Sequence, residues 1–113
     1  MPPKKNPLGL NTLQLKTLAL FQALARLPAH ATPGPDGTVR IADPPSPHGN
    51  HVHLGDGVAA AADATGLGNE AVWVALERKG LARSLYPIAI ILTPAGLGYD
   101  TGLGSKLIHR GDH

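Results

Sequence analysis

Three of the six histidines in this 113-residue chain fall in the short run HGNHVH, at His48, His51 and His53. The part HVHL alternates polar and apolar residues, which predicts a strand with both of its imidazoles on one face. Imidazole nitrogens are common ligands of Zn²⁺, Ni²⁺ and Cu²⁺, and Asp56 follows closely enough to add a carboxylate oxygen. The pattern therefore indicates a candidate metal site at His48, His51, His53 and Asp56. Solvent-exposed histidines without a ligand, and a pH-responsive role, are the alternative interpretations.

The remaining sequence shows no catalytic constellation. It contains no nucleophile elbow, no HExxH motif, no phosphate-binding glycine loop followed by Lys and Ser or Thr, and no carboxylate pair at a telling spacing. Its glycines fall at predicted turns and helix ends instead. The sequence therefore predicts a binding protein and not an enzyme.

Bulk composition narrows the class of protein further. The length suits a single hydrophobic core, and the absence of cysteine excludes disulfides and thiolate metal sites. Ten Lys and Arg against eight Asp and Glu give a formal net charge of +2, which permits nucleic-acid binding without requiring it. The start of the chain lacks a secretory signal, and no run reaches the ~20 apolar residues of a membrane span. We therefore expect a cytoplasmic protein with no membrane partner.

A long helix is predicted over 11–27. Asn11 can cap it, and Gln14 three residues later can complete a capping box. Leu15 and Leu18 lie away from the main apolar stripe and form a candidate contact between the two copies of a homodimer. The stripe itself, which should face the core, consists of Leu13, Thr17, Leu20, Phe21, Leu24 and Leu27.

The stretch from 56 to 80 has the pattern of two short helices joined by a glycine turn. The first is predicted over 58–65, after Asp56 as a cap, and has the high helix propensity of the run AAAADA. Gly66 ends it. Asn69 caps the second, over 70–79, and Gly80 ends that one.

Extended segments flank this helix pair. A short strand is predicted over 38–41, and a β-hairpin over 81–92 with its turn at Tyr86 and Pro87. A short helix should begin at the Thr-Pro pair that follows. The domain is expected to span 10–108, between a flexible basic arm over 1–9 and a mobile tail over 109–113.

The runs VAAAADATGLGNEAVWVALERKGLA and ILTPAG resemble the helix, turn, recognition helix and last wing strand of the winged helix-turn-helix superfamily, especially the MarR-like bacterial regulators. The resemblance covers about two-thirds of the chain. It implies an α+β fold of helix, short strand, helix-turn-helix, short β-hairpin wing and C-terminal helix. It also implies a homodimeric transcriptional regulator that binds double-stranded DNA.

The resemblance assigns DNA contacts to the second helix of the pair and to nearby basic residues. Asn69, Glu70 and Trp73 would face the major groove, although Trp73 is equally well interpreted as a half-buried core residue. The residues that would meet phosphates are Arg40, Arg78, Lys79, Arg83 and Lys106.

Two features favour an alternative. The candidate recognition helix sets Glu70 and Glu77 against Arg78 and Lys79, so its net charge is near zero, and the wing sequence LYPIA is apolar. An apolar wing suits a core or a protein partner better than a phosphate backbone. The alternative function is a winged-helix protein-interaction module with the histidine metal site and without DNA binding.

Overall fold

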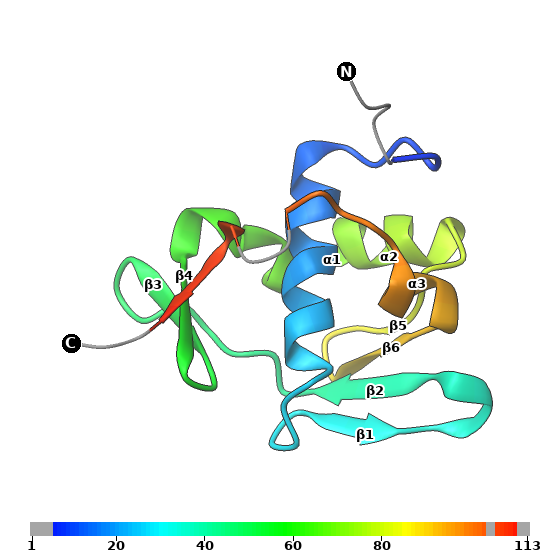
Figure 1. Ribbon diagram of the computed structural model, residues 1–113, viewed down its shortest axis with the longest axis horizontal. Helices are drawn as coiled ribbons and strands as arrows, with labels where there is room; N and C mark the ends of the chain where they lie inside the picture. Colours follow the sequence, from blue (N-terminus) through cyan, green and yellow to red (C-terminus); the bar gives the residue numbers. More distant parts are fainter. Residues whose placement is uncertain (1–5, 104–105, 111–113) are drawn as a thin grey trace.

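Helix α1 (Thr12–Leu24) runs through the middle of the molecule in this computed structural model, which describes residues 6–103 and 106–110 (Figure 1). The predicted capping box is present. The Asn11 side chain accepts a hydrogen bond from the Gln14 amide at 2.8 Å, and the Gln14 side chain accepts one from the Asn11 amide at 3.0 Å. Both bonds satisfy donors that the first turn of a helix leaves unpaired, so the predicted helix start is confirmed.

The second half of α1 is buried around most of its circumference, because other elements contact it on several sides. Leu18 is 0% exposed and belongs to the core of its own chain, and Leu15 is partly buried against that core. The interpretation of these two leucines as a homodimer contact is therefore corrected. The prediction assumed that only one face of the helix would be buried, whereas several faces of α1 are covered.

A four-stranded antiparallel sheet closes one end of the core. In sheet order its strands are β1 (Ala31–Pro33), β2 (Val39–Ala42), β6 (Ala89–Leu92) and β5 (Ala82–Leu85). The strand and the hairpin predicted from the sequence appear with ends within one residue of those expected. Strand β1 was not among the predicted strands; its proline is tolerated because β1 lies at the sheet edge.

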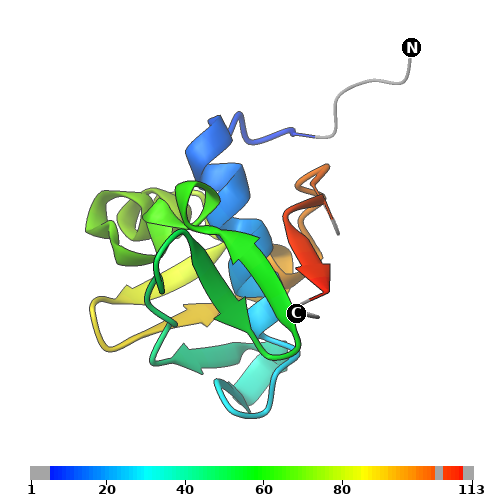
Figure 2. The same cartoon turned by 90° about the vertical axis from the view of Figure 1, so that its left-hand side faces the viewer.

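Three further strands form a second antiparallel sheet, in the order β3 (His51–Leu54), β4 (Gly57–Ala60) and β7 (Ile108–Arg110). Figure 2 shows this sheet in front of α1. Val52 and Leu54 are buried in the same core as the residues of the four-stranded sheet. His51 and His53 lie on the opposite face, as the alternation predicted.

The prediction of a helix over 58–65 is wrong. Its first residues form strand β4, which pairs with β3 on one side and β7 on the other. Two 3-10 segments follow, η2 (Ala61–Asp63) and η3 (Thr65–Gly68). Helix propensity is a weak preference in so short a run, and burial of Ala59 between paired strands outweighs it.

The next two helices match the sequence prediction. Helix α2 (Glu70–Arg78) starts where the Asn69 side chain accepts a hydrogen bond from the Ala71 amide at 3.1 Å. Helix α3 (Pro94–Gly98) starts where the Thr93 hydroxyl accepts one from the Gly96 amide at 3.1 Å. Both helices lie on the side of α1 away from the three-stranded sheet (Figure 1).

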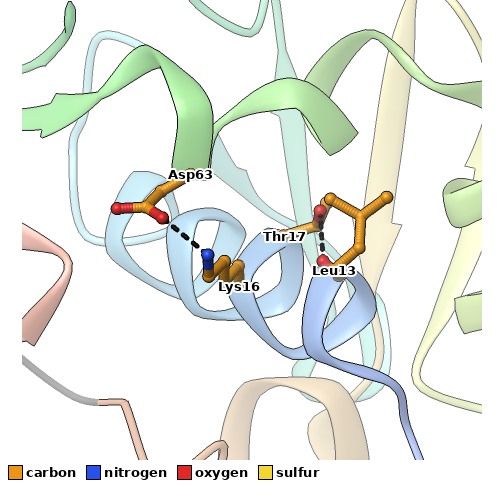
Figure 3. A network of polar contacts seen from close by, with 4 residues as sticks. All are labelled: Leu13, Lys16, Thr17 and Asp63. Atoms are coloured by element: carbon orange, nitrogen blue, oxygen red, sulfur yellow. Dashed lines mark hydrogen bonds and ion pairs between the residues drawn. The ribbon is translucent and has the colours of Figure 1, made fainter.

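Segment η3 packs directly against α1 at a glycine. A Cβ atom placed on Gly66 overlaps the side chain of Thr17. Thr17 is fully buried, and its hydroxyl donates to the Leu13 carbonyl at 2.8 Å. In the same region Lys16 Nζ lies 2.7 Å from Asp63 Oδ1 (Figure 3). The path of η2 and η3 across α1 therefore depends on the absence of a side chain at position 66.

The predicted domain ends need correction at both sides. The Asn6 side chain bonds to the backbone of Leu10 and accepts from the Tyr99 hydroxyl, and the Leu8 amide donates to that hydroxyl at 3.1 Å. Residues 6–9 are thus attached to the domain, while the rest of the expected arm, 1–5, lies outside the described residues. Strand β7 takes in 109 and 110 from the expected tail, and 111–113 again lie outside.

The chain is therefore an α+β domain in which three α-helices and two small antiparallel sheets share one core, within the described residues. None of those helices is long and apolar enough to cross a membrane.

Candidate functional site

Trp73 is 1% exposed, so it is a core residue and not a contact for DNA. Its ring lies edge-on to Phe21, with centroids 5.4 Å apart, and to Tyr86, with centroids 4.8 Å apart. Its Nε1 donates a hydrogen bond to the Gly66 carbonyl at 3.1 Å. The assignment of Trp73 to the major groove is corrected, and its burial exceeds even the half-buried alternative.

The solvent-facing side of α2 has balanced charge. Glu70, Glu77, Arg78 and Lys79 are all exposed, two of them acidic and two basic. Glu77 accepts a hydrogen bond from the Ser84 amide at 2.7 Å and so joins the helix to strand β5. The side chain of Asn69 is already engaged as the helix cap. This surface offers phosphates no net attraction.

The other predicted phosphate contacts lie elsewhere. Strand pairing sets Arg83 opposite Ile91, and Ile91 opposite Arg40, in one row across the four-stranded sheet. Because Ile90 and Leu92 point into the core, this row lies on the face turned away from it. Lys106 is exposed and precedes β7 in the other sheet. The structure does not gather the eight predicted DNA contacts into one surface.

We call the exposed side of the four-stranded sheet, with Arg40, Arg83, Leu85 and Ile91, the outer face. Neighbouring strands lie about 4.8 Å apart, so the two arginines of the row start about 10 Å from each other with an isoleucine between them. Leu85 lies on the same face as Arg83, two residues further along β5. The outer face therefore combines positive charge with apolar surface.

The hairpin tip, residues 85–88, carries two exposed large apolar side chains. Leu85 is 40% exposed and Ile88 is 66% exposed, and no other large apolar residue in the described part of the chain is as open. The turn is closed by a hydrogen bond from the Ile88 amide to the Leu85 carbonyl at 2.9 Å, and the Tyr86–Pro87 peptide bond is cis. The sequence predicted only the hairpin and its turn at Tyr86 and Pro87, so the exposure of Ile88 was missed.

The tip is supported from the core side by an aromatic side chain. Tyr86 packs against Trp73, and its hydroxyl donates to the Gly68 carbonyl at 2.9 Å. These contacts connect the turn to α2 and to η3. The exposed side chains at positions 85 and 88 are therefore presented on a fixed base, which lowers the entropy cost of binding.

A cleft of about 310 Å³ lies beside the hairpin tip. Tyr86 is the only titratable residue that lines it, and its hydroxyl is already hydrogen-bonded. The cleft suits an apolar group, and its other side-chain polar groups are the hydroxyls of Ser46 and Thr65. Its apolar lining comes mainly from Pro44, Pro45, Pro47, Leu67, Tyr86 and Pro87.

The structure brings the three predicted histidines near one another without assembling the predicted metal site from the residues that it describes. His51 and His53 have their Nε2 atoms 3.2 Å apart, and the ring of His48 lies 6.2 Å from that of His51 and 6.4 Å from that of His53. Asp56 lies exposed in the β3–β4 turn. Within residues 6–103 and 106–110, no three His, Asp or Glu side chains are placed to hold a metal ion together, so the predicted four-ligand site is not assembled.

Comparison of the chain with models of protein families, with curated proteins and with solved structures finds no match. The function is therefore inferred from the surfaces described above.

Proposed function

We propose that this protein is a winged-helix protein-interaction module whose hairpin tip and outer face bind an acidic, amphipathic segment of a partner protein. The order of α1, β2, α2 and the β5–β6 hairpin follows the order of helix, strand, recognition helix and wing. Strand β2 pairs with β6, the returning strand of that wing. In this proposal η2 and η3 replace the first helix of the helix-turn-helix, and the β3–β4 hairpin is an insertion.

The observation that carries the proposal is the exposure of Leu85 and Ile88 on a supported hairpin, between a proline-lined cleft and two arginines. Complete burial of a Leu or Ile side chain contributes about 1.5–3 kcal/mol, and these two side chains already have a fixed position. Arg40 and Arg83 can pair with carboxylates on either side of an apolar anchor. A segment with an apolar residue between acidic ones matches this arrangement.

Duplex DNA fits the surface less well. Glu70 and Glu77 would lie against phosphates in the groove position that the resemblance assigns to α2. The hairpin tip would then place two apolar side chains against a charged backbone. A protein partner satisfies both the charges and the apolar tip.

Panning of a displayed random-peptide library on the immobilised full chain should enrich peptides that combine acidic residues with a large apolar one. Binding of the enriched peptide should weaken at least about tenfold in the variant Leu85→Ser/Ile88→Ser and again in Arg83→Glu, since 1.4 kcal/mol corresponds to tenfold. Arg26→Glu is the matched charge control, because Arg26 is exposed beyond the end of α1 and should leave binding unchanged. Peptides that bind the hairpin variant as tightly as the wild type would rule the proposed surface out.

Fluorescence anisotropy with a mixed-sequence DNA duplex tests the competing function. The proposal predicts no saturable binding at about 50 mM salt, where a regulator binds tightly and then loses affinity steeply on going to about 200 mM. Tight, salt-weakened binding that Leu85→Ser/Ile88→Ser leaves intact would favour the DNA-binding regulator instead.

A further inference from the structure

We propose that the solvent face of the three-stranded sheet binds one divalent late transition-metal ion through His51 and His53, with His48 as the third ligand. This site lies on the other sheet from the hairpin tip, so it is independent of the proposed protein contact. It differs from the sequence prediction in leaving out Asp56.

The first two ligands are already in position. A metal ion about 2.0–2.1 Å from each of two imidazole nitrogens, at an angle between square-planar and tetrahedral, requires those nitrogens to lie about 2.9–3.4 Å apart. The Nε2 atoms of His51 and His53 lie 3.2 Å apart and are hydrogen-bonded to each other, so a bound ion would take the place of the shared proton. The two ring centroids lie 4.8 Å apart, close to the ~5 Å that the same metal geometry gives. The i, i+2 spacing on strand β3 therefore sets a chelating pair.

The third ligand is close and is held by the backbone. The His48 amide donates to the His51 carbonyl at 2.6 Å, so the chain folds back on itself beside β3. His48 is exposed, and its ring centroid lies about 1–1.5 Å farther from the other two rings than the ~5 Å spacing of rings that share an ion. A rotation of an exposed side chain supplies the movement that closes this difference. Water would complete the coordination sphere on the open side of the sheet.

The ligand set selects the class of metal. Imidazole nitrogens favour Cu²⁺, Ni²⁺ and Zn²⁺, with Cu²⁺ expected to bind most tightly of the three. Mg²⁺ prefers oxygen ligands and should not bind here. The sheet itself is fixed without the metal, because Val52 and Leu54 anchor β3 in the core.

Isothermal titration of the full chain, produced without an affinity tag, with Cu²⁺, Ni²⁺, Zn²⁺ and Mg²⁺ tests the proposal. One ion of each late metal should bind per chain, and Mg²⁺ should not bind. His51→Gln/His53→Gln should weaken binding at least about 100-fold and His48→Gln at least about tenfold, because loss of even an outer-shell partner of a metal ligand costs about 10–100-fold. His30→Gln is the matched control, because the His30 Nδ1 faces the carbonyl of Ala42 at the end of β2, in the other sheet, and the change should not affect affinity.

A second readout separates metal loss from misfolding. Thermal unfolding of all variants without metal should match the wild type, and added Zn²⁺ should raise the midpoint of the wild type but not of His51→Gln/His53→Gln. Wild-type affinity retained by His51→Gln/His53→Gln overturns the proposal, as does a wild-type chain that binds none of the three late metals.

Discussion

Trp73→Ala should lower the free energy of unfolding by about 3–5 kcal/mol, the range found when a fully buried large aromatic is truncated. Trp73 is 1% exposed and contacts an aromatic ring on each of two sides. The change also removes the donor to the Gly66 carbonyl. Chemical denaturation followed by far-ultraviolet circular dichroism measures the loss.

A conservative change separates packing from the hydrogen bond. Trp73→Phe keeps an aromatic ring between Phe21 and Tyr86 but leaves the Gly66 carbonyl without its indole donor, so it should cost less, about 1–3 kcal/mol. If Trp73→Ala lowers the free energy of unfolding by less than about 1 kcal/mol, the buried position is contradicted. Trp73 would then be a surface residue that could contact DNA.

Gly66→Ala is expected to be the second most damaging of the changes considered, at about 3 kcal/mol, the upper end of the range for overpacked sites. The added methyl group overlaps the side chain of Thr17, which is fully buried on α1 and cannot swing into solvent. Either η3 must lift from α1 or the helix must shift. Differential scanning calorimetry of the purified variant measures the effect.

Two companion variants make the steric cause testable. Gly68→Ala lies in the same 3-10 segment, but nothing lies within 4 Å of its added Cβ, so its stability should be unchanged or slightly higher. Thr17→Ala removes the overlapping hydroxyl, so Gly66→Ala should cost less in that background than in the wild type. Equal losses for Gly66→Ala and Gly68→Ala would exclude the close approach as the cause.

Elements with a local stop or start signal could be predicted from the sequence. Asn11 with Gln14, Asn69 and Thr93 each mark a helix start by a side-chain hydrogen bond that lies within three residues of the cap. The alternation in HVHL and the turn at Tyr86 and Pro87 are equally local. These signals need no knowledge of what packs against them.

Elements that depend on distant partners could not be predicted in this way. The alanine run that forms β4 is a strand because β3 and β7 pair with it, and β7 comes from residues about fifty positions later. The burial of Leu18 likewise depends on elements from several parts of the chain that contact α1. Tertiary contacts override helix propensity and face periodicity in both cases.

In the candidate surfaces, too, only the features with a local sequence signal could be predicted. The histidine pair on one strand face follows from alternation alone, whereas His48 joins it only because the backbone turns back at Gly49, where φ is +70°. Trp73 was one of the predicted DNA contacts, with a core position as the alternative, and its place against Phe21 and Tyr86 is a property of the whole core. No local signal in LYPIA indicates that Leu85 and Ile88 are exposed.

The central claim, that the hairpin tip is a protein-binding surface, is tested most directly by an amide NMR titration of the ¹⁵N-labelled chain. Addition of the peptide enriched by panning should shift the amides of residues 83–86 and 88, of Ser46 beside the cleft, and of Arg40 and Ile91. The same concentration of duplex DNA should shift none of them. Peptide shifts confined to other parts of the chain, or DNA-induced shifts that cluster on residues 69–79 of the α2 surface, would contradict the claim.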